Sequence, residues 1–305
     1  MTHRRTVAVV ASTLLIACMA ASSFVLHRAD QLHPAGSLDD VLFLSSPTVI
    51  KRASLGYDGL AACIYWTRAV QYFGYRHHYF ATSYNLLAPL LEITTHLDPH
   101  LLVAYEFGTS FLAPQPPHGA GEPERAVELM QYGIEQNPNN WRLYYDLGFV
   151  YYMDLRDYKR AAETFERGSK VPNAHPFLKV LAAQMAQHAG EYDTARMLWS
   201  ATYQTAQDQQ IKENAVEHLR ALRVDEDVQH LQEAVTRFGE RTGRLPANLA
   251  ELATAEHLPG IPLDPDGHPY KITPEGRIEV RVPDDFPFAT RGLPPGYEPK
   301  FRRAP

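Results

Sequence analysis

Apolar side chains recur every three or four residues through most of residues 55–208, the spacing that places them on one face of an α-helix. The pattern breaks and restarts with a period of roughly 34 residues, and each unit ends near a proline. The clearest unit extends from Pro138 to Pro172, and its first half places Tyr144, Leu147 and Tyr151 on one helix face. A single helical hairpin cannot bury such a face, so we expect neighbouring hairpins to stack on it.

Small and aromatic residues complete this unit. Gly148 on the first helix and Ala161 on the second allow close approach, and Phe165 follows at helical spacing. One extra residue lies in the turn between Met153 and Tyr158. The frame extends in both directions, at these positions: Phe107, Gly108, Phe111, Ala126, Gly133 and Pro138 before it, and Ala183, Gly190, Tyr192, Ala195 and Trp199 after it. A weaker first hairpin is predicted from helices over 57–73 and 84–97.

The Leu147-Gly148, Tyr151, Ala161 and Phe165 pattern resembles the tetratricopeptide repeat, and the chain resembles bacterial membrane-anchored proteins of that family. The resemblance implies a mainly α fold, a superhelix of helical hairpins over residues 55–223, and a groove that binds segments of partner proteins. Projecting the repeat frame gives these groove-facing residues: Tyr105, Thr109, Arg142, Tyr145, Phe149, Tyr152, Gln184 and Gln187. Alternatively, some of them contact a neighbouring helix or the C-terminal module.

The repeating helical pattern ends near residue 223, and a different sequence pattern follows. A helix over 210–222 is expected to cap the stack, and a cluster of charges at 223–227 marks a boundary. Beyond it we predict a helix ending near Gly243, a short helix over 249–256, and two strands, 270–273 and 277–282, joined by a turn.

The segment Leu245–Tyr270 resembles the globular part of the major pseudopilins of type II secretion. The resemblance implies a small α+β module over residues 224–286. The hydrophobic pilin helix with its prepilin cleavage site does not stand upstream, and no acidic calcium loop is evident, so the resemblance implies the fold and not filament assembly or calcium binding. The tail, residues 287–305, is rich in proline and is expected to run extended over the surface.

The N-terminal residues 1–27 read as a membrane segment. Thr6–Leu26 carries no charge and is long enough to span a bilayer as a helix. Arg4 and Arg5 precede it and place the bulk of the chain in the periplasm, as a single-pass protein of the bacterial inner membrane. Two alternatives stay open: a cleaved signal peptide, and a lipoprotein acylated at Cys18, since Leu15–Cys18 resembles a lipobox. Residues 28–54 are expected to form a connector.

Charge and candidate chemistry narrow the function classes. The net charge is −6, and acidic and basic residues are interspersed along the chain. This pattern argues against a clustered basic surface that would bind nucleic acid. Two cysteines give no disulfide framework, and Cys63 is expected to be buried. The histidines His77, His78, His96 and His100 lack metal-ligand spacing, with the first two expected in a loop. Asp264, Asp266 and His268 are typical of a tight turn.

We therefore expect no catalytic, cofactor or metal site, and no small-molecule substrate. The leading hypothesis is a periplasm-facing scaffold that binds partner proteins in its groove, in secretion or pilus-like envelope assembly. The second is a structural accessory subunit of a larger membrane complex, bound through the convex face of the stack and the tail. The third, an enzyme, has no motif to support it.

Overall fold

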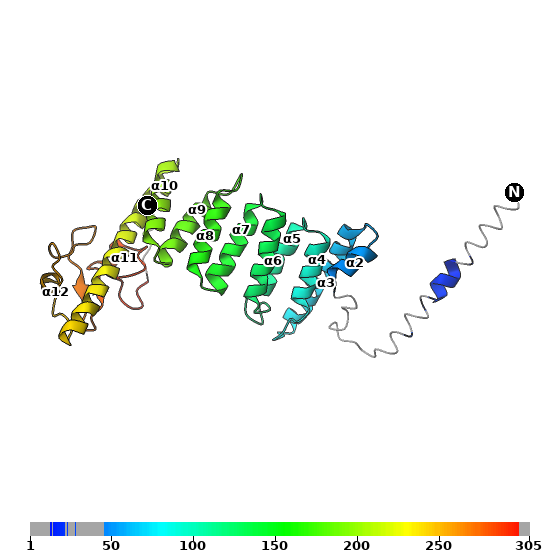
Figure 1. The fold of residues 1–305 in the computed structure, drawn as a ribbon, viewed down its shortest axis with the longest axis horizontal. Helices are drawn as coiled ribbons and strands as arrows, with labels where there is room; N and C mark the ends of the chain where they lie inside the picture. Colours follow the sequence, from blue (N-terminus) through cyan, green and yellow to red (C-terminus); the bar gives the residue numbers. More distant parts are fainter. Residues whose placement is uncertain (1–12, 14, 22, 24–27, 29–45, 299–305) are drawn as a thin grey trace. The chain divides into compact units, whose positions relative to one another are not determined.

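The computed structural model describes residues 13, 15–21, 23, 28 and 46–298. The chain divides into two compact units, Met1–Leu97 and Asp98–Pro305, and the described part is mainly helical (Figure 1). The predicted membrane segment and most of the predicted connector lie largely outside the described residues. Among the residues that are described, no helix has both the length and the apolar character needed to cross a membrane.

Over residues 46–97 the first unit forms three helices: α2 (Pro47–Ala53), α3 (Asp58–His78) and α4 (Leu87–Leu97). Helix α2 lies where the sequence suggested only connector, and it begins with Pro47, which suits a first helical turn. Leu55 and Gly56 adopt positive φ and turn the chain into α3. Helix α3 is longer than predicted, so His77 and His78 end a helix instead of lying in a loop. Helices α3 and α4 pack together as the predicted hairpin.

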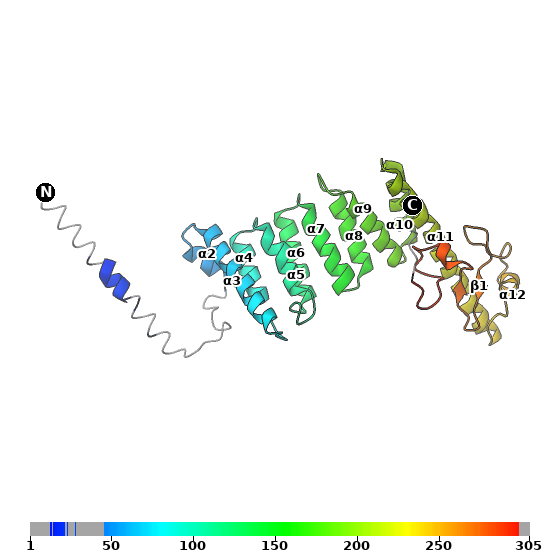
Figure 2. The ribbon, with the colours of Figure 1, turned by 180° about the vertical axis from the view of Figure 1, so that it is seen from behind.

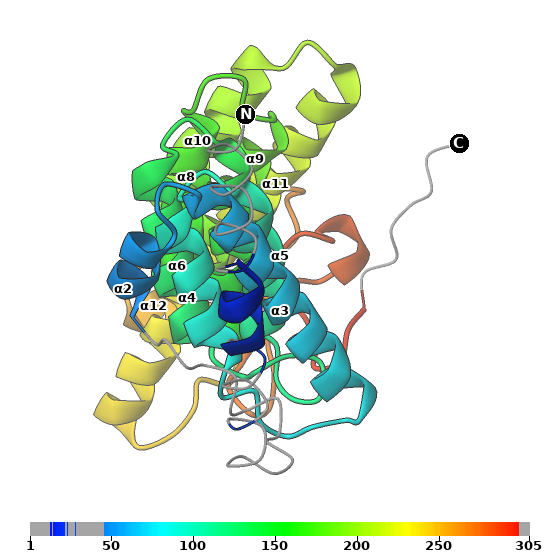
Figure 3. The same ribbon diagram turned by 90° about the vertical axis from the view of Figure 1, so that its right-hand side faces the viewer.

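The second unit begins with six helices, each packed against the next. Figures 1 and 2 show these helices side by side in chain order, and Figure 3 views the row from one end. Their bounds are α5 (Leu102–Leu112), α6 (Pro123–Gln136), α7 (Trp141–Phe149), α8 (Tyr158–Ser169), α9 (Phe177–His188) and α10 (Tyr192–Thr205). The prediction of a mainly helical fold is confirmed, and the predicted helices of this region pack on one another in sequence.

Glycines set the spacing between these helices. A Cβ atom on Gly148 would lie 2.4 Å from Cε1 of Phe165, so α7 and α8 approach closely only because Gly148 has no side chain. Gly133 is covered in the same way by the ring of Tyr105. Tyr105 on α5 and Tyr144 on α7 make equivalent hydrogen bonds. The hydroxyl of Tyr105 donates to the carbonyl of Pro99 at 3.1 Å, and that of Tyr144 donates to the carbonyl of Pro138 at 3.4 Å.

The extra residue of the 138–172 unit is accommodated by a π-helical turn. Residues Val150–Asp154 form the π-helix η2 directly after α7. The amide of Leu155 bonds to the carbonyl of Val150 at 3.1 Å, five residues earlier. A π-turn is the usual way for a helix to absorb one inserted residue, and such turns are frequent at functional sites.

Helix α11 (Gln209–Thr242) differs from the prediction. It is one continuous helix of 34 residues, whereas the sequence suggested a capping helix, a boundary near 223 and a second helix. It contains no proline, and Arg223 and Asp227, taken as boundary charges, form an i,i+4 ion pair at 3.1 Å. Gly243, with φ of 69°, ends it.

The C-terminal module packs against the second half of α11. It comprises α12 (Leu249–Ala255), the antiparallel strands β1 (Lys271–Ile272) and β2 (Ile278–Glu279), and the 3-10 turn η3 (Pro283–Asp285). The predicted short helix and hairpin are confirmed, although the strands are shorter than expected. The beginning of the predicted surface tail is not extended over the surface, because Phe288 and Ala289 pack into the core of this module.

Candidate partner-binding groove

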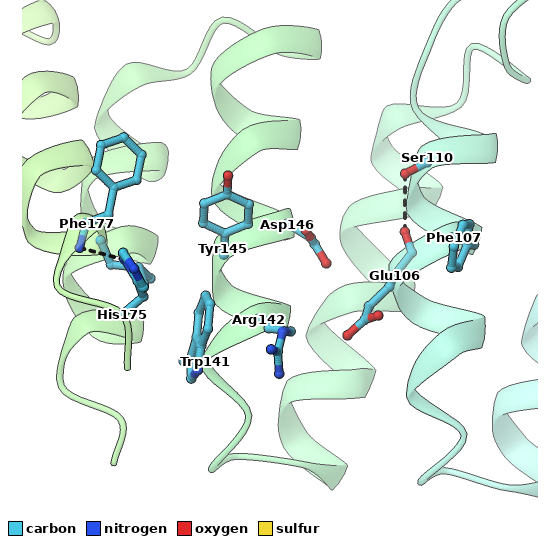
Figure 4. Close-up of a pocket in the computed structure, with 10 residues that line it drawn as sticks. Glu106, Phe107, Ser110, Trp141, Arg142, Tyr145, Asp146, His175 and Phe177 are labelled. Carbon is cyan, nitrogen blue, oxygen red and sulfur yellow. Dashed lines mark hydrogen bonds between the residues drawn. The ribbon is translucent and has the colours of Figure 1, made fainter. Parts of the chain in front are cut away.

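A hollow of about 510 Å³ opens between α5, α7 and the start of α9 (Figure 4). Helix α7 contributes Trp141, Arg142, Tyr145 and Asp146. The remaining lining residues come from α5 and from the segment that enters α9: Glu106, Phe107, Ser110, His175, Phe177 and Leu178.

A second hollow of about 410 Å³ adjoins the first and shares Ser110, Tyr145 and Asp146 with it. Its other lining residues follow α7 into the π-turn and reach the loop after α5: Thr109, Ala113, Pro114, Phe149, Val150, Met153 and Asp154. We call the two hollows together the α5–α7 groove. Both are open rather than enclosed, which suits a segment of polypeptide that passes through the site.

Aromatic rings form a ladder along one wall of this groove. The centroids of Trp141 and Tyr145 lie 6.3 Å apart, those of Tyr145 and Phe149 4.8 Å, and those of Phe149 and Tyr152 6.2 Å. The spacing of three or four residues puts all four rings on one side of α7 and its π-turn. Phe165 of α8 supports the ladder from behind, with its ring 5.5 Å from that of Phe149. The rings are therefore fixed in place while their outer faces stay accessible.

Four of the predicted groove residues lie at this site. Arg142, Tyr145 and Phe149 line the groove, and Tyr152 lies at the end of the ladder, with its ring centroid 6.0 Å from that of Tyr158 in a tilted pair. Gln184 is half-buried and contributes to neither hollow.

The other three predicted residues are corrected by the structure. Tyr105 has no exposed surface and packs on Gly133, so it is a core residue. Thr109 is buried, and its hydroxyl donates a hydrogen bond to the Tyr105 carbonyl at 2.7 Å. It therefore lies at the bottom of the second hollow and its polar group does not face a partner. Gln187 is 3% exposed, and its amide donates to Asp225 at 2.8 Å. It joins α9 to α11 instead of facing a partner.

The error in the first repeat is a register error. Tyr105 and Tyr144 make the same hydrogen bond, so Tyr105 corresponds to Tyr144 and not to the groove residue Tyr145. A shift of one residue turns a side chain by about 100° around the helix. The correct groove positions on α5 are therefore Glu106 and Ser110, one residue after each predicted one. The shared Tyr-to-Pro spacing in the sequence was the signal that could have found them.

The electrostatics of the groove centre on Asp146. Burial, with the nearby Glu106 carboxylate, raises the pKa of Asp146 to about 7, and Arg142 acts in the opposite direction. The guanidinium of Arg142 lies 5.0 Å from the ring centroid of Trp141, in a cation–π contact.

Other candidate sites resolve as structural features. Asp264 accepts hydrogen bonds from the backbone amides of Asp266 at 3.0 Å and His268 at 2.9 Å, which confirms the predicted tight turn. Cys63, expected to be buried, is exposed on α3, and Cys18 is also exposed. In the part of the chain that the structure describes, no three His, Cys, Asp or Glu side chains are grouped so as to hold a metal ion.

Comparisons with known protein families, with curated proteins and with solved structures find no match to this chain.

Proposed function

We propose that this protein is a membrane-anchored scaffold of the bacterial envelope that holds segments of partner proteins in the α5–α7 groove. In this proposal the stacked hairpins are a tetratricopeptide-type superhelix, residues 1–27 attach the chain to the inner membrane, and the bulk of the chain faces the periplasm. The C-terminal module is pseudopilin-like in fold, which favours secretion or pilus-like assembly as the setting. The protein acts by binding and carries out no reaction of its own.

One observation carries the proposal: an open groove walled by a supported aromatic ladder. Tyr and Trp are enriched among the residues that dominate binding energy, because they offer large rigid surfaces with few rotatable bonds. Tyr145 lies at the middle of the ladder and lines both hollows. A segment of a partner protein bound in either hollow would therefore contact Tyr145.

Site-specific photocrosslinking in cells tests this assignment. A benzophenone amino acid replaces Tyr145 in the full chain, and a matched variant carries it at Glu135, which is exposed on α6 and outside both hollows. We expect discrete crosslinked products from position 145 and none from position 135. Products from position 135 alone would contradict the groove and favour the accessory-subunit alternative, in which partners bind the outer face of the stack.

A further inference from the structure

Two neighbouring carboxylates of the groove are only partly compensated by positive charge. Glu106 of α5 and Asp146 of α7 direct their carboxylates into the same space between the two helices (Figure 4). Neither forms a salt bridge with any residue in the described ranges. Their mutual repulsion and the burial of Asp146 act in the same direction on its pKa, which is raised to about 7.

Arg142 lines the same hollow and acts against the raised pKa of Asp146, but it forms no salt bridge with either carboxylate. Its guanidinium is engaged over the ring of Trp141. Farther along the groove, Asp154 adds a third carboxylate in the second hollow, and burial raises its pKa too, against the opposing effect of Arg156. Across the two hollows, three carboxylates therefore face a single guanidinium. The groove is complementary to positive charge.

Apolar side chains line the groove together with the carboxylates. Tyr145 and Trp141 lie on the same helix as Asp146, Phe177 lines the far side of the first hollow, and Phe149 and Met153 line the second (Figure 4). A long aliphatic stem ending in a cation matches this arrangement, because the stem packs on the rings while the head reaches the carboxylates. The aromatic faces also attract a cation directly.

We propose that the groove selects partner segments that carry a lysine or arginine side chain, whose cationic head sits between Glu106 and Asp146 while a neighbouring apolar side chain packs on Tyr145 and Phe177. This inference rests on the proposed function of the groove and adds the class of segment that it takes. An acidic segment would meet like charges, and a neutral one would leave the carboxylates desolvated without a partner.

Binding of defined peptides to the full chain in non-ionic detergent tests the selection. The probes are fluorescent peptides of one Leu-containing sequence that differ at a single position, which is Lys, norleucine or Glu. Norleucine keeps the aliphatic stem and removes the charge. We expect the Lys peptide to bind roughly tenfold or more tightly than the norleucine peptide and the Glu peptide to bind weakest.

Substitutions locate the effect. Glu106→Gln with Asp146→Asn is expected to remove the advantage of the Lys peptide and leave the norleucine peptide unchanged. Glu106→Lys is expected to favour the Glu peptide. The matched control, Glu163→Gln, changes an exposed acid of α8 outside both hollows and is expected to alter nothing. Circular dichroism confirms that each variant is folded.

Two results distinguish the selection of cationic segments from the proposed binding of partner segments in the groove. If the norleucine peptide binds as tightly as the Lys peptide, or the Gln/Asn variant keeps the preference for Lys, the cationic selection is overturned and the groove stands. If Tyr145 gives no crosslinks in cells and no peptide binds, both are overturned.

A different surface, on the first unit, carries a second inference. Three large apolar side chains lie exposed along one face of α3: Leu60 at 61%, Ile64 at 48% and Tyr75 at 51%. Ala62 and Ala69 have no exposed surface and lie on the opposite face of the same helix. More exposed apolar residues flank the helix at both ends: Leu55, Tyr57, Tyr79 and Phe80. We call this set the α3 surface. Its apolar side chains gather at the two ends of the helix, with the exposed Thr67, Arg68 and Gln71 between them, and such exposed apolar groups mark an interaction site.

The composition around the α3 surface suits a phospholipid bilayer. Over residues 46–80 four basic residues stand against one acidic residue, Asp58. Tyrosine mixed with Leu, Ile and basic side chains is typical of segments that lie at a membrane surface. The uncharged run Thr6–Leu26 precedes it in the sequence. The residues between Leu26 and Ser46 can span at most about 70 Å when extended, which would hold α3 within reach of the bilayer.

We infer that the α3 surface lies against the outer leaflet of an anionic phospholipid bilayer. The inference rests on the membrane attachment proposed above and adds a second contact. Cys63 is exposed on the same helix and gives a native position for a reporter. The full chain carrying Cys18→Ser is labelled there with an environment-sensitive fluorophore and reconstituted into vesicles that contain phosphatidylglycerol.

Nitroxide-labelled lipids are expected to quench the Cys63 reporter, and Leu60→Glu with Ile64→Glu is expected to remove most of the quenching. A reporter at Glu163→Cys in a chain without native cysteines is the unquenched control.

Protein that floats with the vesicles without quenching overturns the α3 contact and leaves the anchor in place. Protein that does not float overturns both. Crosslinking of Cys63 between two chains, without quenching, assigns the surface to a second copy instead.

Discussion

At the scale of single residues, His218 is the most unusual group in the described part of the second unit. Its ring is stacked between Trp199 at 4.0 Å and Phe288 at 4.1 Å, and neither of its nitrogens has a hydrogen-bond partner. Burial, with the nearby His188, lowers the pKa of His218 to about 4. The folded protein therefore holds this imidazole neutral at a pH where the unfolded chain would protonate it.

The sign of the resulting pH dependence follows from linkage. Between about pH 6.5 and the folded pKa of about 4, the unfolded chain binds more protons at His218, so stability falls as the pH falls. We expect a loss of about 3 kcal/mol across this range. His218→Phe keeps an aromatic stack and should abolish that part of the loss, measured by urea unfolding at several pH values. His230→Gln, an exposed change on α11, should lose stability like the native chain; equal acid sensitivity in His218→Phe would contradict the assignment.

Gly148 supports a second prediction at this scale. A methyl group there would meet the Phe165 ring at 2.4 Å, so Gly148→Ala must displace that ring and with it the support of the aromatic ladder. We expect a net loss of about 1–2 kcal/mol despite the better helix propensity of alanine. Gly74→Ala in α3 is the matched control: nothing lies within 4 Å, so it should gain about 0.5–1 kcal/mol. Urea midpoints that rise for both variants would contradict the packing role of Gly148.

Individual residues were predicted correctly from the sequence where a single packing requirement, such as small size, explains the residue type. Gly148 and Ala161 were assigned to close helix contacts from their size; Gly148 has no room for a side chain, and Ala161 is fully buried. Groove positions were harder, because exposure depends on the angle around the helix. One residue of error on α5 exchanged the buried Tyr105 for the groove residue Glu106. Gln187 could not be placed at all without Asp225, which lies 38 residues away in the chain.

At the scale of elements, helix type and order were predictable and helix ends were not. Periodicity identified the hairpins, but charges at 223–227 were read as a break although they lie within α11. Asp225 among them is buried and accepts hydrogen bonds from the backbone amides of Thr290 at 2.7 Å and Arg291 at 2.8 Å. A carboxylate that looks solvated in the sequence thus has its partners in a distant segment.

The continuity of α11 gives a prediction at this scale. Proline at the exposed Arg223 would remove a helical hydrogen bond and clash with the preceding turn, so Arg223→Pro should cost about 3 kcal/mol or more. Arg223→Ala loses only the partly exposed ion pair with Asp227 and should cost under about 1 kcal/mol. The free energies of unfolding in urea distinguish the two. Similar small costs for both variants would indicate the linker that the sequence suggested.

At the scale of the second unit, the contacts join the helical stack to the C-terminal module. Gln187 of α9 donates to Asp225 of α11 and to the carbonyl of Phe288 at 3.0 Å, and the ring of His218 stacks on that of Phe288. Helix α11 contributes both to the contact with α10 and to the core of the module. The compact unit accordingly runs from Asp98 through the module, whereas the sequence suggested separate domains divided at residue 223.

A unit joined in this way should unfold in one step. Leu143→Ala in α7 and Ile278→Ala in β2 each remove a buried side chain, at 0% and 3% exposure, and should each cost about 2–5 kcal/mol. Because α11 is common to both cores, calorimetry should show the same major transition moving down by several degrees in either variant. A module that folds independently would behave differently: Ile278→Ala would split off a separate low-temperature transition and leave the one sensitive to Leu143→Ala where it was. The shared transition would mean that any partner that stabilises the groove also stabilises the module, which would link the two ends of this unit during binding.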